Sequence, residues 1–276
     1  MEKKKSLGKI FGIIVLVLAL LLGGAAVAFK IYTSNYYATD SGMTSRITAE
    51  YEEQVEIYVN NDGMVFVPKD QDYRAAIVFY PGGKVEYTAY ASLMCKLSSR
   101  GFVCFLTRMP ENIALLGVDL VDKLMPEEAV VQKLAGIEMD WYMAGHSLGG
   151  TAASKYISGI FDEKALGDEK EVGSAPGGWG QFKGIIFCGS YPSYDLKDKP
   201  IRMLSILGSN DSVLNRNSYE ESKTFWPEDT TEYVIDGGNH SYFGCYGLQN
   251  GDGIPKITNE EQLDITADVI DKWIGR

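Results

Sequence analysis

Apolar and polar positions follow three different patterns along this chain. Residues 10–29 form an uncharged apolar run, and residues 55–66 alternate between apolar and polar side chains around a turn. From residue 75 onward, short apolar runs alternate with stretches in which apolar residues recur at helical spacing. A run of about 20 apolar residues is long enough to cross a bilayer as a helix. The pattern therefore predicts an N-terminal apolar helix followed by a unit of mixed strands and helices.

The longer part of the chain predicts a mostly parallel sheet. Asn61-Asp62-Gly63 is a turn signal between two alternating runs, which favours an antiparallel hairpin. Runs typical of strands buried on both faces occur at 75–80, 102–107, 141–144, 185–188 and 203–207, with a shorter one at 232–235. Helical spacing occurs at 87–99, 112–124, 148–160, 219–226 and 262–274. Strands that alternate with helices imply a doubly wound α/β sheet with helices on both faces.

The charges beside the apolar run give its expected orientation. Three lysines, Lys3–Lys5, precede it and should stay in the cytoplasm. Residues 1–9 are therefore expected to be a cytoplasmic basic tail, and 10–29 a single transmembrane anchor with everything after it outside the cytoplasm. Ala26-Val27-Ala28 resembles a signal-peptidase site, so a cleaved signal sequence is the alternative. Both interpretations export the rest of the chain.

The exported part divides into an expected stalk and one globular domain. Residues 30–46 are polar and aromatic without a period and are assigned to the stalk, which leaves 47–276 for the domain. The formal net charge is −11, and the first 30 residues, with five lysines and one glutamate, contribute +4 of it, so the remainder carries −15. So acidic a domain repels nucleic acid and anionic lipid head groups. No nucleic-acid partner is expected.

Cysteine and histidine usage limits the redox and metal chemistry. The four cysteines are far apart, lack C-x-x-C spacing and lie mostly in apolar contexts: Cys95, Cys104, Cys188 and Cys245. We expect buried structural thiols, with a single disulfide as the alternative. Two histidines are too few for a histidine-based metal site. Neither a metal nor an organic cofactor is expected.

A strand, turn and helix signal around Ser147 gives the first candidate for chemistry. Residues 145–149, GHSLG, fit the pattern G-x-S-x-G, in which a serine occupies a sharp turn between a buried strand and a helix. Apolar residues before the turn predict the strand, and small residues after it predict a helix packed closely on the sheet. Serine is a poor nucleophile at neutral pH and needs such exposure beside a base. We therefore expect Ser147 to be a nucleophile rather than part of an ordinary small-residue turn.

Only one histidine is placed to act as the base. His146 directly precedes Ser147, so its side chain should point away from the serine. His240 lies in a glycine-rich loop that follows the last predicted strand, where it can reach over the carboxyl edge of the sheet. Removal of the serine proton requires such a base. His240 is the expected general base.

A carboxylate is needed to fix the tautomer of that imidazole and to stabilise its cation. Asp211 directly follows the strand predicted at 203–207 and lies between Ser147 and His240 in the chain. Asp195, in the loop after the preceding strand, is the alternative, whereas Asp236 is too close to His240 in sequence to reach around the ring. We favour Asp211.

Backbone amides must stabilise the negative charge that develops on the substrate oxygen. One donor should be the N–H of Leu148, the residue after the nucleophile. The other should come from the loop after an earlier strand, and residues 80–84, YPGGK, supply two glycines that let main chain approach a substrate. We assign Gly83, with Gly82 and Lys84 as the alternatives within one residue.

Two further sets of residues are candidates for substrate contact. Residues 161–183 contain acidic residues, five glycines and a proline between a predicted helix and strand, which is typical of a mobile surface loop, with a lid as the alternative. Five aromatic residues near predicted strand ends are candidates for an aromatic pocket or for packing: Tyr87, Tyr191, Tyr194, Tyr242 and Phe243.

With these residues placed, the chain resembles the α/β-hydrolase superfamily, and more narrowly the bacterial, often membrane-anchored hydrolases grouped with dienelactone-hydrolase-like proteins. The segments that carry the resemblance are FYPGGKVE at 79–86, RMP at 108–110, GHSLGG at 145–150, GSND at 208–211 and GGNHSYFGCYG at 237–247, with Gln249, Gly251, Asp252 and Gly253. The match spans roughly residues 50–275. It implies an α/β-hydrolase fold and a serine hydrolase of esters or related acyl compounds. Dienelactone hydrolases use cysteine, so serine here argues against that substrate.

Three functions remain at this point. The first is an extracytoplasmic, membrane-tethered, carboxylesterase-like hydrolase of a small-molecule ester or acyl substrate. The second is an acyltransferase, in which an alcohol replaces water as acceptor at the same triad of Ser147, Asp211 and His240. The third is a binding protein that keeps this fold without activity, although loss of a triad residue would have indicated it and none is missing.

Overall fold

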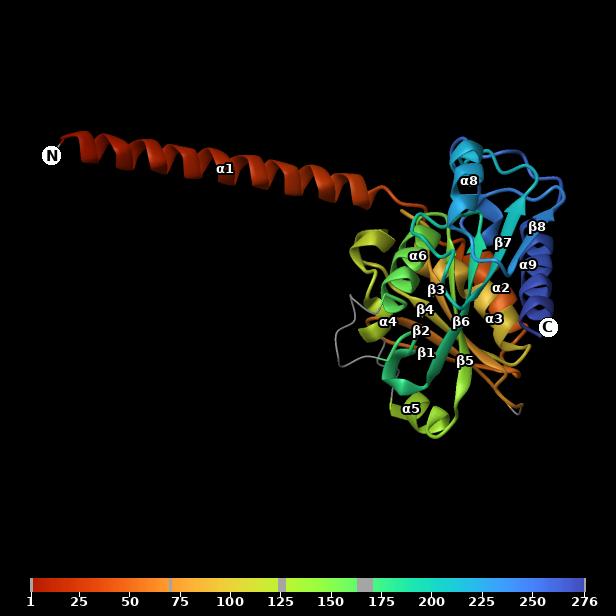
Figure 1. Ribbon diagram of the computed structural model, residues 1–276. Coiled ribbons are helices and arrows are strands. Elements are labelled where there is room, and N and C mark those ends of the chain that lie inside the picture. The colour runs from red at the N-terminus through yellow and green to blue at the C-terminus, as the bar shows by residue number, and fades with distance from the viewer. Residues whose placement is uncertain (1, 70, 124–127, 163–170, 276) are drawn as a thin grey trace. The chain divides into compact units, whose positions relative to one another are not determined.

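The computed structural model describes residues 2–69, 71–123, 128–162 and 171–275. These residues form two compact units, one that ends at Tyr36 and one that begins at Tyr37 (Figure 1). The first unit is essentially one helix, α1 (Glu2–Ser34). Its segment Phe11–Ser34 has a mean hydropathy of 2.7 and is long and apolar enough to span a membrane, a property that an N-terminal signal sequence shares.

The second unit is built on a sheet that contains eight strands in the described part of the chain. In sequence order they are β1 (Val55–Val59), β2 (Gly63–Pro68), β3 (Ala75–Tyr80), β4 (Phe102–Thr107), β5 (Met139–His146), β6 (Gly180–Cys188), β7 (Arg202–Gly208) and β8 (Thr230–Ile235). Their spatial order is β1-β2-β4-β3-β5-β6-β7-β8. The hairpin β1–β2 and the pair β2–β4 are antiparallel, and all other pairs are parallel. The expected doubly wound, mostly parallel sheet is confirmed.

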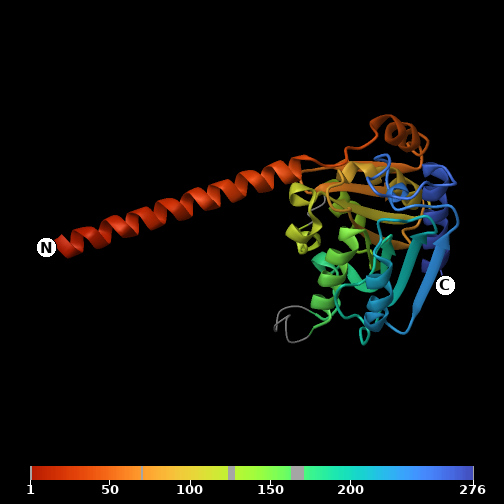
Figure 2. The same ribbon diagram turned by 90° about the horizontal axis from the view of Figure 1, so that it is seen from above.

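Helices cover both faces of this sheet (Figures 1 and 2). One face packs against α2 (Ser41–Ala49), α3 (Ala91–Ser98) and α9 (Asn259–Ile274), and the other against α4 (Leu120–Lys123), α5 (Glu128–Leu134) and α6 (Leu148–Ile160). A further helix, α8 (Arg216–Ser222), follows β7 and packs through Tyr219 on Leu207. Because side chains of a strand alternate between faces, β3 contributes Ile77 to the first core and Val78 to the second.

Burial along the strands follows their place in the sheet. Every residue of the central strands β3 and β4 is buried, which explains why their sequences are apolar throughout. The edge strand β1 instead alternates, with Val55 buried and Glu56, Ile57, Tyr58 and Val59 partly or fully exposed. Because β3, β5, β6, β7 and β8 pair in parallel, their carboxyl ends lie along one edge of the sheet. The loops that follow these strands meet at that edge.

The elements between the central strands differ from the expected ones in several places. The helix expected at 112–124 is replaced by two short 3₁₀ turns (Pro110–Asn112 and Ala114–Leu116) and by α4. The first turn contains Glu111 at φ 52°, followed by Asn112 at φ 55°, a left-handed backbone that no α-helix accommodates. The helix α5 was not anticipated. Of the loop 161–183, residues 163–170 lie outside the described residues, and β6 already begins at Gly180.

Residues 37–46, which the sequence assigned to the stalk, contain regular structure of the second unit. Tyr37 forms a parallel bridge with Val85: its N–H donates to the Lys84 carbonyl at 2.7 Å, and its carbonyl accepts from the Glu86 N–H at 2.9 Å. Helix α2 begins four residues later, where Asp40 accepts from the Met43 N–H at 3.0 Å as an N-cap. The compact unit therefore starts ten residues before the expected boundary at residue 47.

Candidate active site

Ser147 occupies the turn between β5 and α6 in a strained backbone conformation. Its φ is 50° and its ψ is −123°, a region that residues with a Cβ rarely adopt and that costs about 1–3 kcal/mol. Three contacts hold it there. Its N–H donates to the Cys188 carbonyl at 3.1 Å, and its carbonyl accepts from the Gly150 N–H at 3.0 Å and from the Ser190 hydroxyl at 2.7 Å. Such a turn presents the serine side chain at the carboxyl edge of the sheet.

Small residues around the turn let the following helix sit directly on the sheet. A Cβ at Gly149 would lie 2.1 Å from the Tyr80 carbonyl oxygen, so only glycine fits there. The end of β3 is therefore in contact with the first turn of α6. This close approach brings the loop after β3 beside Ser147, as the sequence interpretation required.

His240 and Asp211 form a buried pair. The His240 Nδ1 lies 2.8 Å from Oδ2 of Asp211, and both side chains are at most 1% exposed. The other carboxylate oxygen, Oδ1, accepts from the N–H groups of Val213 at 3.0 Å and Leu214 at 2.8 Å. The carboxylate is thus held by three donors, and because Oδ2 can only accept in its ionised form, Nδ1 of His240 carries the proton.

The remaining ring nitrogen of His240, Nε2, is buried and makes no hydrogen bond in the described structure. A histidine protonated on Nδ1 has an unprotonated Nε2, which is an acceptor. His240 and Ser147 line the same cavity, so the one unpartnered acceptor of the pair shares a small space with the serine.

Neither alternative acid is hydrogen-bonded to His240 in the described structure. Asp195 is exposed in the loop after β6, where its Oδ1 accepts from the N–H of Lys197 at 2.9 Å. Asp236 is also exposed, and its Oδ1 accepts from the Ser209 hydroxyl at 3.4 Å. Of the three carboxylates considered from the sequence, the structure pairs only Asp211 with the histidine.

The two residues expected to supply the oxyanion donors are in contact. A Cβ added to Gly83 would be 2.8 Å from Cδ2 of Leu148, so the loop after β3 touches the residue after Ser147. The N–H of Gly82 donates to the Tyr90 hydroxyl at 3.0 Å, and that of Lys84 donates to the Asn112 carbonyl at 2.7 Å. Within the part of the chain that the structure describes, the Gly83 N–H has no such partner. Leu148 is the first residue of α6, where an amide has no acceptor within its helix.

A small cavity joins these groups. Its volume is about 230 Å³, and its lining is mostly apolar. It is lined by Ser147, Leu148, Thr151, Gly189, Ser190, Tyr191, Val213, Leu214, Asn215 and His240. Of the five aromatic residues considered from the sequence, Tyr191 lines this cavity, whereas Phe243 is buried in the core and Tyr194 is exposed.

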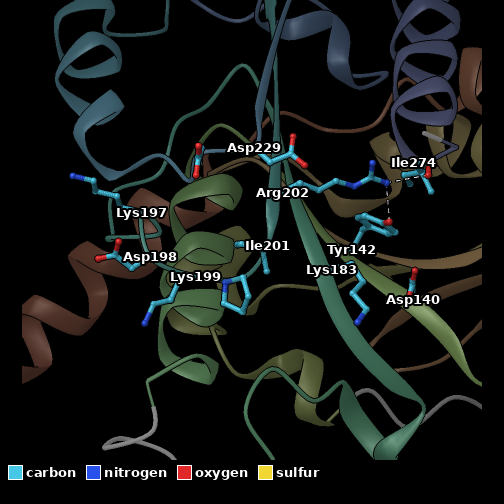
Figure 3. Close-up of a pocket in the computed structure, with 12 residues that line it drawn as sticks. Asp140, Tyr142, Lys183, Lys197, Asp198, Lys199, Ile201, Arg202, Asp229 and Ile274 are labelled. Atoms are coloured by element: carbon cyan, nitrogen blue, oxygen red, sulfur yellow. Dashed lines mark hydrogen bonds between the residues drawn. The ribbon is translucent and has the colours of Figure 1, made fainter.

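A larger cavity lies elsewhere in the described structure, at the amino ends of the strands (Figure 3). It has a volume of about 750 Å³ and is open to solvent, and exposed charges of both signs surround it, including Lys183, Lys197 and Asp229. One of its lining side chains, Arg202, donates to the Tyr142 hydroxyl and to the Ile274 carbonyl, both at 2.9 Å. No candidate site residue from the sequence lines it.

One residue that positions the histidine loop was not singled out as a site residue in the sequence. Oδ1 of Asp252 accepts from the His240 N–H at 3.3 Å. Its Oδ2 accepts from both the N–H of Ser241 at 2.8 Å and the hydroxyl of Ser241 at 2.7 Å. Asp252 stands between Gly251 and Gly253, a turn signal that marks it as a loop residue but says nothing of its partner twelve positions earlier.

The cysteines take no part in this chemistry. All four are buried free thiols, so the disulfide alternative does not occur. Burial raises the pKa of the Cys188 thiol to about 12, although its backbone lies next to Ser147. A thiol with so high a pKa is protonated and unreactive at neutral pH.

Comparison with known proteins agrees with the fold. Residues 76–264 match the family model described as "Alpha/beta hydrolase family". An esterase from Pyrobaculum calidifontis is similar in structure, with a TM-score of 0.50, 14% sequence identity, and coverage of 84% of this chain and 90% of the esterase. A structure from Thermoplasma acidophilum, described as a predicted CIB-like hydrolase, has a TM-score of 0.48 and 16% sequence identity. The match covers 79% of this chain and 98% of the Thermoplasma chain.

At 14% identity the likeness to the esterase shows the fold alone. No curated protein matches the sequence. The family match extends over more than half of the chain and includes Ser147, Asp211 and His240. With the strand order, the strained serine turn and the family match in agreement, the chain belongs to the α/β hydrolase family.

Proposed function

We propose that the protein is a serine hydrolase that cleaves an ester or a related acyl bond. The observation that carries this proposal is the buried His240–Asp211 pair, whose one unpartnered nitrogen shares a cavity of about 230 Å³ with the strained Ser147. An arrangement of this kind serves nucleophilic catalysis, in which a base activates a hydroxyl and an acid orients the base. Membership of a hydrolase family supports the same reaction class.

In the proposed reaction, Oγ of Ser147 attacks the acyl carbon while Nε2 of His240 takes the hydroxyl proton. Asp211 holds the proton on Nδ1 and stabilises the imidazolium that forms. The imidazolium then returns the proton to the leaving alcohol as the ester bond breaks, which leaves the acyl group on Ser147. Water, activated by the same imidazole, attacks the acyl-enzyme and releases the acid and the free serine.

The negative charge on the substrate oxygen needs donors in place before the reaction begins. We assign the N–H groups of Gly83 and Leu148 to this role, because the two residues are in contact and neither amide has another partner in the described structure. Each donor of this kind contributes about 3–4 kcal/mol to stabilisation of the transition state.

The size and character of the cavity limit the acyl group. A volume of about 230 Å³ is below the range typical of sites for drug-sized ligands, and the lining is mostly apolar. Leu148, Val213 and Leu214 are among its apolar lining residues. A short acyl group fits these dimensions.

We further propose that α1 anchors the enzyme in a membrane with the hydrolase unit outside the cytoplasm. The length and hydropathy of Phe11–Ser34 and the lysines ahead of it support this orientation. Two measurements test it: protease digestion of the unit on intact cells, and the mass of the native protein. A native N-terminus at Phe29 would show that the segment is a cleaved signal sequence.

The triad is tested most directly by Ser147→Ala, with Ser158→Ala on the same helix as the matched control. Ser147→Ala should abolish both fluorophosphonate labelling and hydrolysis of short p-nitrophenyl esters, and circular dichroism should stay unchanged. Ser158, whose hydroxyl donates to the Asp195 carbonyl at 3.1 Å, should behave as wild type when changed. Activity of Ser147→Ala within a few-fold of wild type would show that another residue is the nucleophile.

A further inference from the structure

The second histidine of the chain lies behind the proposed triad. His146 is fully buried, and its ring centroid is 4.6 Å from that of His240. Its Nε2 lies 3.1 Å from the His240 carbonyl oxygen, and its Nδ1 lies 2.8 Å from the Tyr90 hydroxyl. The Tyr90 hydroxyl in turn accepts from the Gly82 N–H at 3.0 Å. Four groups from four separate segments are thus linked by three hydrogen bonds.

The direction of each of these bonds follows from the chemistry of the two ends. A carbonyl oxygen only accepts, so Nε2 of His146 must carry a proton and donate to His240. The Gly82 amide only donates, so the Tyr90 oxygen accepts there and its own proton goes to Nδ1 of His146. This assignment requires neutral His146. Burial, and secondarily the nearby His240, hold the pKa of His146 well below its usual range, so the ring is neutral at neutral pH.

The two ends of this chain of bonds lie at the proposed oxyanion loop and at the proposed general base, and the reaction depends on the relative position of these two parts. At one end, Gly82 directly precedes Gly83, the proposed oxyanion donor. A Cβ at Gly82 would lie 2.7 Å from Nδ1 of His146 and 2.8 Å from the Tyr90 hydroxyl, so the loop is pressed against this pair. At the other end is the backbone of the proposed base.

The position of His240 itself depends on hydrogen bonds to other segments of the chain. His240 follows Gly237 and Gly238, residues that restrict the backbone least. Asp252 holds the His240 N–H, Asp211 holds Nδ1 and His146 holds the carbonyl. With all three in place, Nε2 is the one polar atom of His240 that remains for Ser147.

We propose that Tyr90 and His146 are positioning residues that couple the oxyanion loop at Gly82–Gly83 to the backbone of the general base His240. This inference rests on the proposed function, since it concerns how the same site is kept assembled. Neither side chain lines the cavity, so neither touches substrate. Their effect is expected on the rate of the chemical step and not on substrate binding, because misplaced groups weaken interactions made only in the transition state.

Three variants of the full-length protein in detergent separate the links. Tyr90→Phe removes one hydroxyl and keeps the ring that packs on Phe79. His146→Gln offers an amide N–H toward the His240 carbonyl but no acceptor at the Nδ1 position, whereas His146→Asn offers an acceptor near Nδ1 but no donor that reaches His240. Tyr156→Phe is the matched control, since it removes a buried hydroxyl that donates to Asp122 at 2.7 Å, away from the site.

With p-nitrophenyl acetate as the probe, Tyr90→Phe and His146→Asn should each lower kcat by about tenfold or more, with KM changed by less than about twofold. His146→Gln should recover part of the loss seen in His146→Asn, because it restores the bond to the base. The double variant Tyr90→Phe/His146→Asn should be no worse than about twofold below His146→Asn, since the links act as one unit. Tyr156→Phe should keep the wild-type kcat.

If the histidine variants do not fold, the kcat of Tyr90→Phe alone tests the proposal. A kcat within twofold of wild type for folded Tyr90→Phe would overturn the proposal, and so would an equal loss of kcat in Tyr156→Phe. A loss that appears in KM with kcat unchanged would overturn it as well, because it would place these residues in binding. The proposed function fails separately, through activity that survives in Ser147→Ala.

Discussion

The two edges of the parallel sheet both carry cavities, and they differ in what surrounds them. At the amino edge, a cavity of about 750 Å³ is open and ringed by exposed charges of both signs (Figure 3). At the carboxyl edge, a cavity of about 230 Å³ is mostly apolar and holds the open nitrogen of a buried His–Asp pair beside a strained serine. Exposed charges keep their water and need no partner, whereas buried polar groups persist only if held by specific bonds. Burial of converging polar groups, and not volume, marks the candidate site.

The largest expected effect distinguishes Asp211 from Asp195 as the acid that acts with His240. Asp211→Asn keeps the size of the side chain but lets the imidazole adopt the wrong tautomer, which in a related triad costs about 10⁴ in rate. We therefore expect kcat for p-nitrophenyl acetate to fall by several orders of magnitude with little change in KM. Asp195→Asn, which alters an exposed side chain that is not bonded to His240, should change kcat by less than about twofold. The opposite ranking would move the acid to the loop after β6.

The second prediction compares the loss of kcat/KM on changing Asp252 with the loss on changing Asp229, a carboxylate at the amino edge of the sheet. Oδ2 of Asp252 accepts two hydrogen bonds from Ser241. Asp252→Asn replaces that oxygen with an NH₂ group, so a donor faces donors and the loop that carries His240 loosens. Hydrogen bonds to a charged group contribute about 1.5–3 kcal/mol, so a loss of roughly 10- to 100-fold in kcat/KM is expected. Asp229→Asn, in the cavity of Figure 3, should leave kcat/KM unchanged. Steady-state kinetics of the two folded variants makes the comparison, and equal values would contradict it.

Much of this contrast could be predicted from the sequence. Apolar runs bounded by turn residues located β3, β4, β5, β6 and β7, because a strand buried on both faces admits no other composition. The order of Ser147, Asp211 and His240 after successive strands predicted that the three residues share one edge of the sheet, since the carboxyl ends of parallel strands lie there. The pairing of His240 with Asp211 follows the predicted choice among three carboxylates.

The parts that could not be predicted depend on contacts between distant segments. His146 was expected only to point away from Ser147, and nothing in its neighbourhood in sequence indicates Tyr90 or the His240 backbone as partners. Helix α2 was missed because only Thr44 and Ile47 are buried along it, which leaves no clear apolar stripe. The helix expected at 112–124 failed because Gly117 and the left-handed Glu111 and Asn112 interrupt the apolar spacing.

The third effect concerns the size of the cavity at the carboxyl edge. Rates of hydrolysis should be highest for p-nitrophenyl esters with two to four acyl carbons and should fall by roughly tenfold or more at eight, because extra methylenes that do not fit cost about 1–3 kcal/mol. Leu214→Ala removes an apolar wall of the cavity and should move the optimum to longer chains. A flat chain-length profile in wild type would show that the acyl group lies outside this cavity.

A fourth effect follows from the buried histidine behind the triad. The pKa of His146 is lowered by burial, so below about pH 6.5, the ordinary value, the unfolded chain binds a proton that the folded chain does not. The free energy of unfolding should therefore fall as the pH is lowered from 6.5, by up to about 1.4 kcal/mol per pH unit from this residue, and be independent of it above 6.5. Denaturation of wild type and His146→Asn between pH 5 and 8 measures the difference in slope. Parallel curves would contradict a neutral buried His146.

The smallest effect on activity is expected at the amino edge itself. Arg202 donates to the Tyr142 hydroxyl and the Ile274 carbonyl (Figure 3). Its guanidinium carbon lies 4.3 Å from the centre of the Trp273 ring. These bonds tie the start of β7 to the end of α9. Arg202→Met keeps most of the packing but leaves the Ile274 carbonyl without this donor, so it should lower the free energy of unfolding by about 1–3 kcal/mol. The kcat and KM for p-nitrophenyl acetate, measured well below the melting temperature, should stay within about twofold of wild type, because the cavity at this edge has no part in the proposed reaction. A large loss of kcat with unchanged stability would instead assign a catalytic role to the amino edge and remove the contrast between the two cavities.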